Sequence, residues 1–365
     1  MIRQPDPDHS IRKGDIRNAL PSVTVVMPVR NEATFIAQSL GRVLAQDYPQ
    51  DRMEVVVADG MSSDATWTIA QAMRALHPNL RLIENHGRIV STGLNAAIAE
   101  AHGDIIVRVD GHCEISPDYV RRCVEHLRND DVGGVGGFME TVGDTPISQT
   151  IAAGMSSRFG VGDTAFRTVR GKTILADTVP FPAYWRTVIE QAGPFDEELV
   201  RNQDDEYNYR LRKMGVRILL ADDIHSRYHS RSTLRALWRQ YFQYGYWKVR
   251  VMQKHLRQTR LRQFVPPVFV TSLLMSTLLA LFFPFGKVML ALVAGSYASA
   301  NLAASLATAR KSGSRRVRLL PLVFATLHFS YGLGVLVGLV RFWNRWGDSR
   351  TRPRALHNTS TAATP

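Results

Sequence analysis

Short apolar runs alternate with amphipathic stretches over the first third of the chain. Residues 23–29 form a run rich in β-branched side chains, which predicts a buried strand, and the apolar spacing over 35–44 predicts a helix. The pattern repeats, with strands expected at 54–58, 80–84 and 105–109 and helices at 66–76 and 91–101. This alternation indicates right-handed crossovers and a mostly parallel, Rossmann-like sheet of the α/β class. Functional loops are then expected near residues 30, 59, 85 and 110, where the strands end.

The rest of the globular part is less regular. No Gly-x-Gly-x-x-Gly follows the first strand, which argues against a dinucleotide-dependent dehydrogenase. From residue 133 to 221 the alternation loosens, and a second acidic cluster appears at 204–206. We interpret this region as the half that binds a second substrate.

Three apolar stretches, at 264–283, 288–309 and 319–340, are each long enough to cross a hydrocarbon core of about 30 Å as a helix. Buried helices of a soluble protein are the alternative, which the near absence of charge disfavours. The first 20 residues lack an apolar core of the secretory type, so the N-terminal domain is expected in the cytosol. Two cysteines, Cys113 and Cys123, suit that reducing compartment.

Charge divides the chain into two unequal parts. Residues 1–225 carry a net charge of −7, and residues 226–365 carry +20. The basic residues surround apolar runs and do not form a soluble basic face, so we expect an anionic lipid partner and no nucleic acid. The segment 227–262, with ten Lys and Arg, no acid and several aromatic side chains, is expected along the membrane surface.

The strand at 105–109 ends in Asp110-Gly111-His112. A carboxylate and an imidazole two residues apart at a strand end can hold a divalent cation that bridges a diphosphate. A simple turn cap at Asp110 is the alternative. The histidine favours Mn²⁺ over Mg²⁺, and both ions stay open.

The acidic cluster Asp204-Asp205-Glu206 opens a helical stretch that ends at Gly215. One carboxylate at such a site can take a proton from an attacking hydroxyl, and Asp204 is our candidate. Asp205 and Glu206 are expected to line an acceptor site or to support the helix start through its dipole. Spacing alone does not separate these roles.

Other polar residues follow the strand ends. Asp59 is placed to accept a hydrogen bond from the imide of a uracil or from a ribose hydroxyl. Arg88 and Asn95 are candidates to neutralise or orient a donor, and solvated loop polarity is the alternative for each.

Six motifs in order resemble the family 2 nucleotide-sugar glycosyltransferases of the GT-A fold, and within them enzymes of succinoglycan-type exopolysaccharide synthesis. The motifs are Val-Met-Pro-Val-Arg-Asn-Glu (26–32), Val-Ala-Asp-Gly-Met-Ser-Ser-Asp-Ala-Thr (57–66), Gly-Leu-Asn-Ala-Ala-Ile (93–98), Arg-Val-Asp-Gly-His-Cys (108–113), Gly-Pro-Phe-Asp-Glu (193–197) and Asn-Gln-Asp-Asp-Glu (202–206).

The resemblance implies roles for individual residues. Asp59 would contact the donor base, Asp110 would bind the donor through the metal, and Asp204 would be the catalytic base. The donor site would also include Pro28, Asn31 and Glu32 of the first motif, with Arg88 and Asn95.

Two positions depart from the family pattern: His112 replaces the second Asp of Asp-x-Asp, and Gln203 replaces the Glu that commonly precedes the base. The Asp-x-His variant is similar to the metal motif of polypeptide N-acetylgalactosaminyltransferases, in which a later histidine joins the metal. His229 is therefore a candidate third ligand beside Asp110 and His112.

These observations predict an inverting hexosyltransferase that moves a sugar from a nucleoside-diphosphate donor, such as UDP-glucose, to a lipid-linked saccharide in exopolysaccharide or cell-surface glycan synthesis. Processive members carry Gln-x-x-Arg-Trp and more membrane helices, so a single addition is expected here. A polyprenyl-phosphate sugar synthase and a non-catalytic membrane scaffold are the alternatives.

The expected organisation has five parts, in a multi-pass protein of the plasma (inner) membrane with a cytoplasmic catalytic domain. Three crossings would export the basic tail, so one apolar stretch is a candidate for an interfacial helix. The parts are a flexible tail (1–20), a GT-A domain (21–226, with a nucleotide-sugar half at 21–132 and an acceptor half at 133–226), the basic interfacial segment (227–262), the membrane region (263–341) and a basic tail (342–365).

Overall fold

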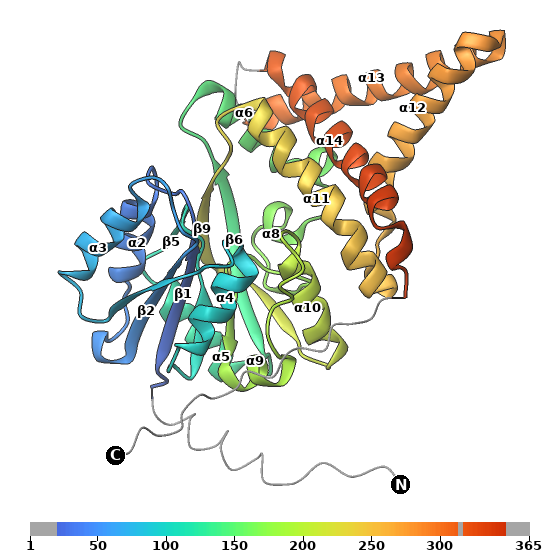
Figure 1. Ribbon diagram of the computed structural model, residues 1–365. Coiled ribbons are helices and arrows are strands. Elements are labelled where there is room, and N and C mark those ends of the chain that lie inside the picture. Colours follow the sequence, from blue (N-terminus) through green and yellow to red (C-terminus); the bar gives the residue numbers. More distant parts are fainter. Residues whose placement is uncertain (1–19, 313–316, 348–365) are drawn as a thin grey trace, which may run out of the picture.

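The computed structural model describes residues 20–312 and 317–347 (Figure 1). Of the two expected tails, residues 1–19 and 348–365 lie outside the described part of the chain. The described residues form a mixed α/β domain with an arm of long helices at one end (Figure 1).

The expected alternation is confirmed over the first third of the chain. The first four strands pair in parallel in the order β3-β2-β1-β4, and the expected element bounds agree within two residues. The strands are β1 (Val23–Val29), β2 (Met53–Asp59), β3 (Leu80–Glu84) and β4 (Ile105–Arg108), and the helices between them are α2 (Ile36–Leu44), α3 (Thr66–Arg74) and α4 (Val90–Ala99).

The same sheet continues through β8, β6, β9 and β5, with β7 paired to β9, so the two expected halves share one sheet. β8 is antiparallel to β4 and β6, whereas β6 and β9 are parallel. The domain boundary expected at residue 226 is wrong, because β9 continues to His229. The bounds are β5 (Cys113–Ile115), β6 (Gly134–Val142), β7 (Ile174–Leu175), β8 (Ala183–Trp185) and β9 (Ile218–His229).

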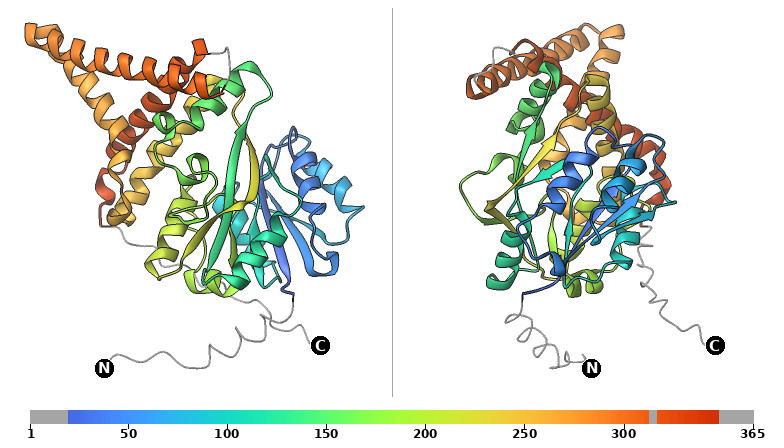
Figure 2. Two further views of the ribbon diagram at one scale, coloured as in Figure 1. Left: turned by 180° about the vertical axis from the view of Figure 1, so that it is seen from behind. Right: turned by 90° about the vertical axis from the view of Figure 1, so that its left-hand side faces the viewer.

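Apolar side chains on both faces of the sheet are buried under helices, which makes three layers (Figure 2). Val25 and Met27 of β1 pack toward α2, and the intervening Val26 packs toward α4, because successive strand residues point to opposite faces. The remaining helices of the domain are α5 (Tyr119–Asn129), α6 (Pro146–Met155), α7 (Arg158–Val161), α8 (Ala165–Thr168), α9 (Arg186–Ala192) and α10 (Gln203–Lys213), with a 3-10 turn at Gln50–Arg52.

The basic segment differs from the expectation of a surface helix. Most of it forms α11 (Leu234–Lys254), which packs along α14 (Leu320–Arg341). Glycines allow a close backbone approach: a Cβ at Gly245 would lie 2.1 Å from the Tyr331 carbonyl oxygen, and one at Gly334 2.2 Å from that of Phe242. Lys248 and Arg250 of α11 are buried, so this helix is an integral part of the packed structure.

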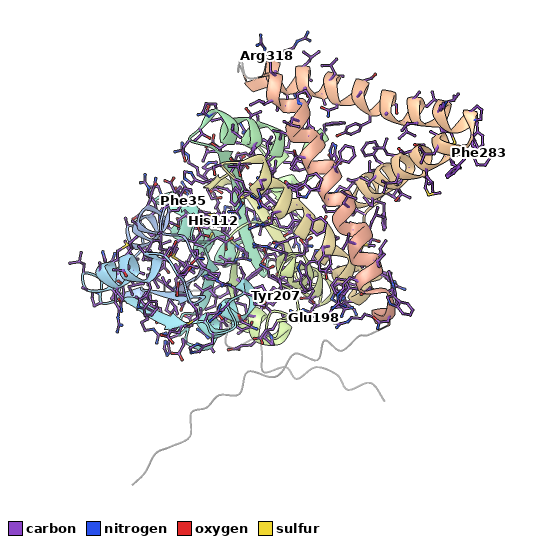
Figure 3. The ribbon with its side chains drawn as sticks, turned by 45° about the horizontal axis from the view of Figure 1, so that its top comes forward. Phe35, His112, Glu198, Tyr207, Phe283 and Arg318 are labelled. Carbon is purple, nitrogen blue, oxygen red and sulfur yellow. The ribbon has the colours of Figure 1, made fainter. Side chains whose placement is uncertain are left out.

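The two helices α12 (Val265–Phe282) and α13 (Pro284–Ser312) form a hairpin that projects from the domain (Figures 1 and 2). Phe283 lies at its free end, whereas Arg318 lies at the other end of α13 (Figure 3). These helices and α14 are long and apolar enough to cross a membrane, as expected. Short 3-10 turns occupy Leu256–Gln258, Leu261–Gln263, Val317–Leu319 and Trp343–Arg345.

α14 differs from the hairpin because both of its ends contact the α/β domain. Half of its apolar window is buried, against 17% and 11% for α12 and α13. Near its start, Phe324 belongs to the same core cluster as Ile151 of α6. Just past its end, Arg345 Nη1 lies 2.9 Å from Glu198 Oε1 in the loop after α9.

Candidate active site

A cavity of about 1230 Å³ lies at the carboxyl ends of β1 and β4. This is the edge of the sheet at which the strand-end residues were expected to gather. Pro28, Glu32, Arg88 and His112 line it on the side of the parallel strands. It continues past α7 and α8 to side chains of α11, α12, α13 and α14.

Arg108, the last residue of β4, joins the two candidate carboxylates in this cavity. Its Nε and Nη2 each lie 2.9 Å from Asp110 Oδ1, and its Nη1 donates a hydrogen bond to Asp204 Oδ1. Arg108 is only 8% exposed, and a buried guanidinium costs free energy unless it is paired. The two carboxylates pair with this guanidinium, so Arg108, Asp110 and Asp204 form one hydrogen-bonded cluster, the catalytic constellation.

The acidic cluster on the first turn of α10 separates into three environments that spacing could not distinguish. Asp204 and Asp205 line the cavity, whereas Glu206 is fully buried behind them. The pKa of Glu206 is lowered, because hydrogen bonds from His255 and Arg210 outweigh the effect of burial. The partners are Arg108 for Asp204, Lys248 for Asp205 (2.9 Å), and Arg210 (2.7 Å) and His255 (3.0 Å) for Glu206.

Asp110 and His112 both line the cavity, as expected of a pair that approaches a diphosphate. His112 Nδ1 lies 2.8 Å from Glu32 Oε1, which orients the ring. Within the described residues, Asp110 Oδ2 and His112 Nε2 take part in no hydrogen bond or ion pair. One oxygen and one imidazole nitrogen are thus available to a ligand.

His229 does not join this pair. Its Nε2 lies 2.8 Å from Glu114 Oε1 and its Nδ1 3.4 Å from Asp144 Oδ2. The ring packs on Phe35 at 4.9 Å, outside the cavity lining. Across residues 20–312 and 317–347, no group of three or more His, Cys, Asp and Glu side chains could hold a metal ion. The expectation of His229 as a third ligand is therefore wrong, because Glu114 holds its ring.

Two other donor-site candidates shape the loops after β1 and β2. Asn31 is exposed, and its Oδ1 accepts a hydrogen bond from the Ser63 N–H at 2.9 Å. Asp59 is 4% exposed and accepts hydrogen bonds from the Ser62 N–H and hydroxyl. An ionised carboxylate has about four lone-pair sites, so Asp59 retains capacity for a donor group. Its neighbour Gly60 lines the cavity.

The structure contradicts the expected role of Asn95 in donor binding. It is buried in α4, where its Nδ2 donates to the Phe195 carbonyl and to Glu197 Oε1, both at 2.9 Å. Its Oδ1 accepts from the Phe195 N–H at 2.8 Å. The side-chain amide thus ties α4 to the loop at 193–197 and lies outside the cavity lining. A donor contact from Asn95 is contradicted by this packing.

Three residues of the cavity wall have left-handed backbone conformations although none is glycine. Their φ angles are 60° at Arg88, 45° at Phe181 and 62° at Asn202. Each such conformation costs on the order of 1–3 kcal/mol and persists where packing imposes it, commonly at functional sites. Asn202 directly precedes α10, so its conformation helps to direct Asp204 toward Arg108.

Sequence analysis missed most of the basic lining of the cavity. Nine Lys and Arg side chains line it against four carboxylates, which favours anionic ligands. Arg231, Lys248 and Arg262 come from the segment that we had assigned to lipid contact. Their number was visible in the sequence, but the direction of their side chains depends on the packing of α11.

Gln203, one of the two departures from the motif pattern, also lines the cavity. It is 4% exposed, and its Oε1 is buried without a hydrogen-bond partner among the described residues. A buried acceptor left unpaired costs free energy, so this oxygen is available to a hydroxyl or N–H group of a ligand.

Comparisons with known proteins identify the family of this chain. A family model described as Glycosyl transferase family 2 matches residues 24–192. The chain is 32% identical over 254 residues to the succinoglycan biosynthesis protein ExoA of Rhizobium meliloti (strain 1021), which covers 67% of this chain and 74% of the relative. It is 30% identical over 208 residues to glycosyltransferase AglE of Haloferax volcanii, covering 57% and 66% respectively.

A solved structure supports the fold. The mannosyltransferase PcManGT from Pyrobaculum calidifontis, in complex with GDP-Man and Mn²⁺, superposes with a TM-score of 0.56. The two chains are 23% identical, and the match covers 88% of each. The similarity therefore extends beyond the sheet.

Proposed function

This chain belongs to glycosyltransferase family 2, and from that premise we propose that it is an inverting hexosyltransferase with a nucleoside-diphosphate sugar as donor. The donor proposed first is UDP-glucose, because the Asp59 carboxylate, next to Gly60 of the cavity wall, would accept from the imide of uracil. The acceptor is a lipid-linked saccharide, and the product belongs to an exopolysaccharide or other cell-surface glycan. The relative named for succinoglycan biosynthesis supports this product class.

The observation that carries the proposal is the joining of Asp110 and Asp204 by Arg108 in a cavity that also reaches the apolar helices. In the reaction, the acceptor hydroxyl oxygen forms a bond to the anomeric carbon. The bond from that carbon to the diphosphate oxygen breaks, and its electron pair leaves with the nucleoside diphosphate. Asp204 takes the hydroxyl proton as general base, while Arg108 fixes the direction of its carboxylate.

A divalent cation, Mn²⁺ or Mg²⁺, fits the groups that the chain offers. Asp110 Oδ2 and His112 Nε2 would hold it, and Glu32 would keep the imidazole oriented. Such ions are often bound by one or two protein side chains together with substrate phosphates, so two protein ligands suffice. When bound, the cation neutralises charge that develops on the departing diphosphate. Arg88 and Arg30 supply further positive charge on the same side of the cavity.

We place the catalytic domain at the cytoplasmic face of the plasma (inner) membrane. The α12–α13 hairpin enters the bilayer, and α14 stays at the interface because both its ends contact the domain. Anionic lipid would contact the outer basic residues of segment 227–262 and of the region around Arg310. In domain terms, the catalytic unit extends from residue 21 to 229, and α11 joins it to the membrane region.

A donor screen tests the proposal. Purified full-length protein is incubated with UDP-glucose, other nucleotide sugars, lipid-linked saccharides and either cation, and transfer of labelled sugar is measured. UDP-glucose should give lipid-linked product only with a cation present, and the Asp110→Asn variant is the matched negative control. Absence of transfer from every nucleotide sugar, with binding of the nucleotide intact, would instead support a non-catalytic scaffold.

One observation favours a second enzyme function. The excess of arginine in the cavity also suits a lipid phosphate as the nucleophile, as in a polyprenyl-phosphate sugar synthase. A phosphate oxygen is already ionised and needs no general base. Transfer to a prenyl monophosphate that survives the loss of Asp204 basicity would therefore favour this alternative.

A further inference from the structure

We propose that Arg262 binds the phosphate groups of a prenyl-diphosphate-linked acceptor, and that the prenyl chain lies along the cavity wall formed by α12, α13 and α14. This inference rests on the proposed function, because it gives the lipid-linked acceptor its binding site. Three observations carry it: the extent of the cavity, the state of the Arg262 guanidinium and the chemistry of the apolar wall.

The cavity is continuous from the catalytic constellation to the membrane helices. The same lining includes Asp204 and the side chains of Phe269 on α12, Val293 on α13 and Leu327 on α14. A water-soluble sugar acceptor would not bury an apolar wall of this kind. An amphiphile with its polar end at Asp204 and its hydrocarbon end between the helices fits both parts.

Arg262 stands where the two parts meet. It lies in the 3-10 turn immediately before α12, at the first turn of the apolar stretch 261–282. Its Nη1 is buried and has no hydrogen-bond partner among the described residues. Two other cations close in the chain or in the cavity have carboxylate partners: Arg260 pairs with Asp177, and Lys248 with Asp205.

An unpaired buried guanidinium N–H is costly unless a ligand accepts from it. Gly162, with φ of 65°, lies against the Arg262 side chain, and a Cβ there would be 3.1 Å from Cδ. Guanidinium groups bind phosphate through paired hydrogen bonds. Arg262 lies at the start of the apolar stretch 261–282, so it would be near lipid phosphates when α12 enters the bilayer.

The apolar wall is preformed. Phe269 and Tyr297 stack with ring centroids 4.2 Å apart, and both line the cavity. The Tyr297 hydroxyl and His328 Nδ1 form a hydrogen bond at 3.1 Å, so these two polar atoms do not need a water molecule from the cavity as a partner. Ala300 of α13 lines the same cavity and has a small side chain. A branched hydrocarbon chain can therefore contact this wall without leaving polar groups unpaired.

The test measures binding to the full-length protein in detergent by calorimetry, with saturating UDP and Mg²⁺ to fill the donor site. The probes are farnesyl diphosphate, farnesol and inorganic diphosphate. Farnesyl diphosphate should bind at least tenfold more tightly than either partial probe. Arg262→Gln should weaken its binding about tenfold or more, because a charge-assisted contact is lost, and should leave farnesol binding unchanged.

Three further variants sharpen the result. Arg260→Gln is the matched control, since Arg260 is outside the cavity lining, and it should bind all probes as the wild type does. Ala300→Phe fills the apolar wall and should weaken farnesyl diphosphate and farnesol alike. Arg262→Lys retains the charge and should restore part of the affinity. UDP binding and the melting temperature check that each variant is folded.

Several outcomes would overturn the inference. If Arg262→Gln binds farnesyl diphosphate as tightly as the wild type does, Arg262 is not part of the site. If the wild type binds inorganic diphosphate as tightly as farnesyl diphosphate, the site recognises a free anion. Equal displacement of the probe by phosphatidylglycerol would indicate a general lipid contact. Because the assay contains no sugar donor and needs no turnover, it can succeed where the proposed transfer fails, and the reverse.

Discussion

Arg108 donates a hydrogen bond to Asp204, although 96 positions separate them in the chain. The contact links the end of the parallel sheet to the first turn of α10. It fixes one carboxylate oxygen and leaves the other directed at the cavity. It also keeps a positive charge beside the group that we propose as the general base, so Arg108 is a positioning residue for that base.

Replacing this arginine should therefore change the pH dependence of transfer. In Arg108→Gln the Asp204 carboxylate loses a neighbouring cation, so the acidic limb of the pH–activity profile should move to higher pH. The maximal rate should fall about 10- to 100-fold, because the carboxylate is less well directed. Steady-state kinetics between pH 5 and 9 measure both effects. A fall in rate with an unmoved profile would indicate a purely structural role.

The metal assignment makes a separate prediction. Asp110→Asn removes charge and little volume, so it should abolish transfer while the melting temperature stays near that of the wild type. For His112→Asp we expect preference to shift from Mn²⁺ toward Mg²⁺, because carboxylate oxygen suits the harder ion. Initial rates over a titration of each ion are the measurement. Full activity in excess chelator would contradict the assignment.

The placement of α14 predicts the side on which the chain continues after it. A single cysteine at Gly347 should react with a membrane-impermeant maleimide in inverted vesicles and not in intact spheroplasts. His86→Cys, in an exposed loop of the catalytic domain, is the matched control and should behave identically. Cys113 and Cys123 are buried and should contribute little background. Labelling of Gly347→Cys from outside alone would mean that α14 crosses the membrane.

Glu198 predicts how stability depends on pH. It lies 2.7 Å from Arg250 and from Lys254 and 2.9 Å from Arg345, which connects the loop after α9 to α11 and to the end of α14. Burial alone would raise its pKa, but hydrogen bonds from Arg250 and Lys254 lower the pKa to about 2. The stabilisation is present above the ordinary pKa of 4.5 and is lost as the pH falls through 2.

We therefore expect Glu198→Gln to lower the free energy of unfolding at pH 7 by on the order of 1–3 kcal/mol, since it leaves a buried arginine less well paired. The difference from the wild type should shrink between pH 4.5 and 2. Thermal melts at pH 7, 5 and 3 test this, with Glu190→Gln at an exposed position as the control. A difference independent of pH would show that charge at Glu198 is not the cause.

Much of the fold follows from local pattern. The β-branched run at 23–29 gives a strand with those bounds, because it is apolar enough to be buried and is followed by polar residues. Residues 80–84 also form a strand with the expected bounds, although only Leu80 in it is buried. The strand-end rule then places Glu32, Arg88 and Asp110 around one cavity. These features depend on residues close together in the chain.

The rest depends on packing that sequence alone does not reveal. Asn95 belongs to a motif of the family resemblance, but the distant loop at 193–197 occupies its amide. Hydropathy detects α14 as apolar and cannot indicate that α6 and α11 cover half of it. In the sequence Arg108 has no feature that marks it as a site residue. Its role depends on the fold, in which α10 brings Asp204 to its guanidinium.

The acidic cluster on α10 provides the prediction that separates the two enzyme functions. Asp204→Asn retains the shape and the contact with Arg108 but loses basicity, so transfer to a sugar hydroxyl should fall by about two to four orders of magnitude with donor affinity intact. Asp205→Asn should be milder, because Asp205 pairs with Lys248 at the side of the cavity. Glu206→Gln should chiefly lower the melting temperature, since Glu206 is buried against Arg210 and His255.

Turnover, donor affinity and melting temperature, measured side by side for these three variants, decide between the proposed roles. A larger loss of turnover in Asp205→Asn than in Asp204→Asn, with donor affinity unchanged, would identify Asp205 as the base. Asp204→Asn that still transfers sugar to a prenyl phosphate, but not to a lipid-linked saccharide, would assign the hydroxyl chemistry to Asp204 and show that the site accepts both nucleophiles. Full activity of Asp204→Asn on the lipid-linked saccharide would exclude this carboxylate as the base, because no amide can take the proton in its place.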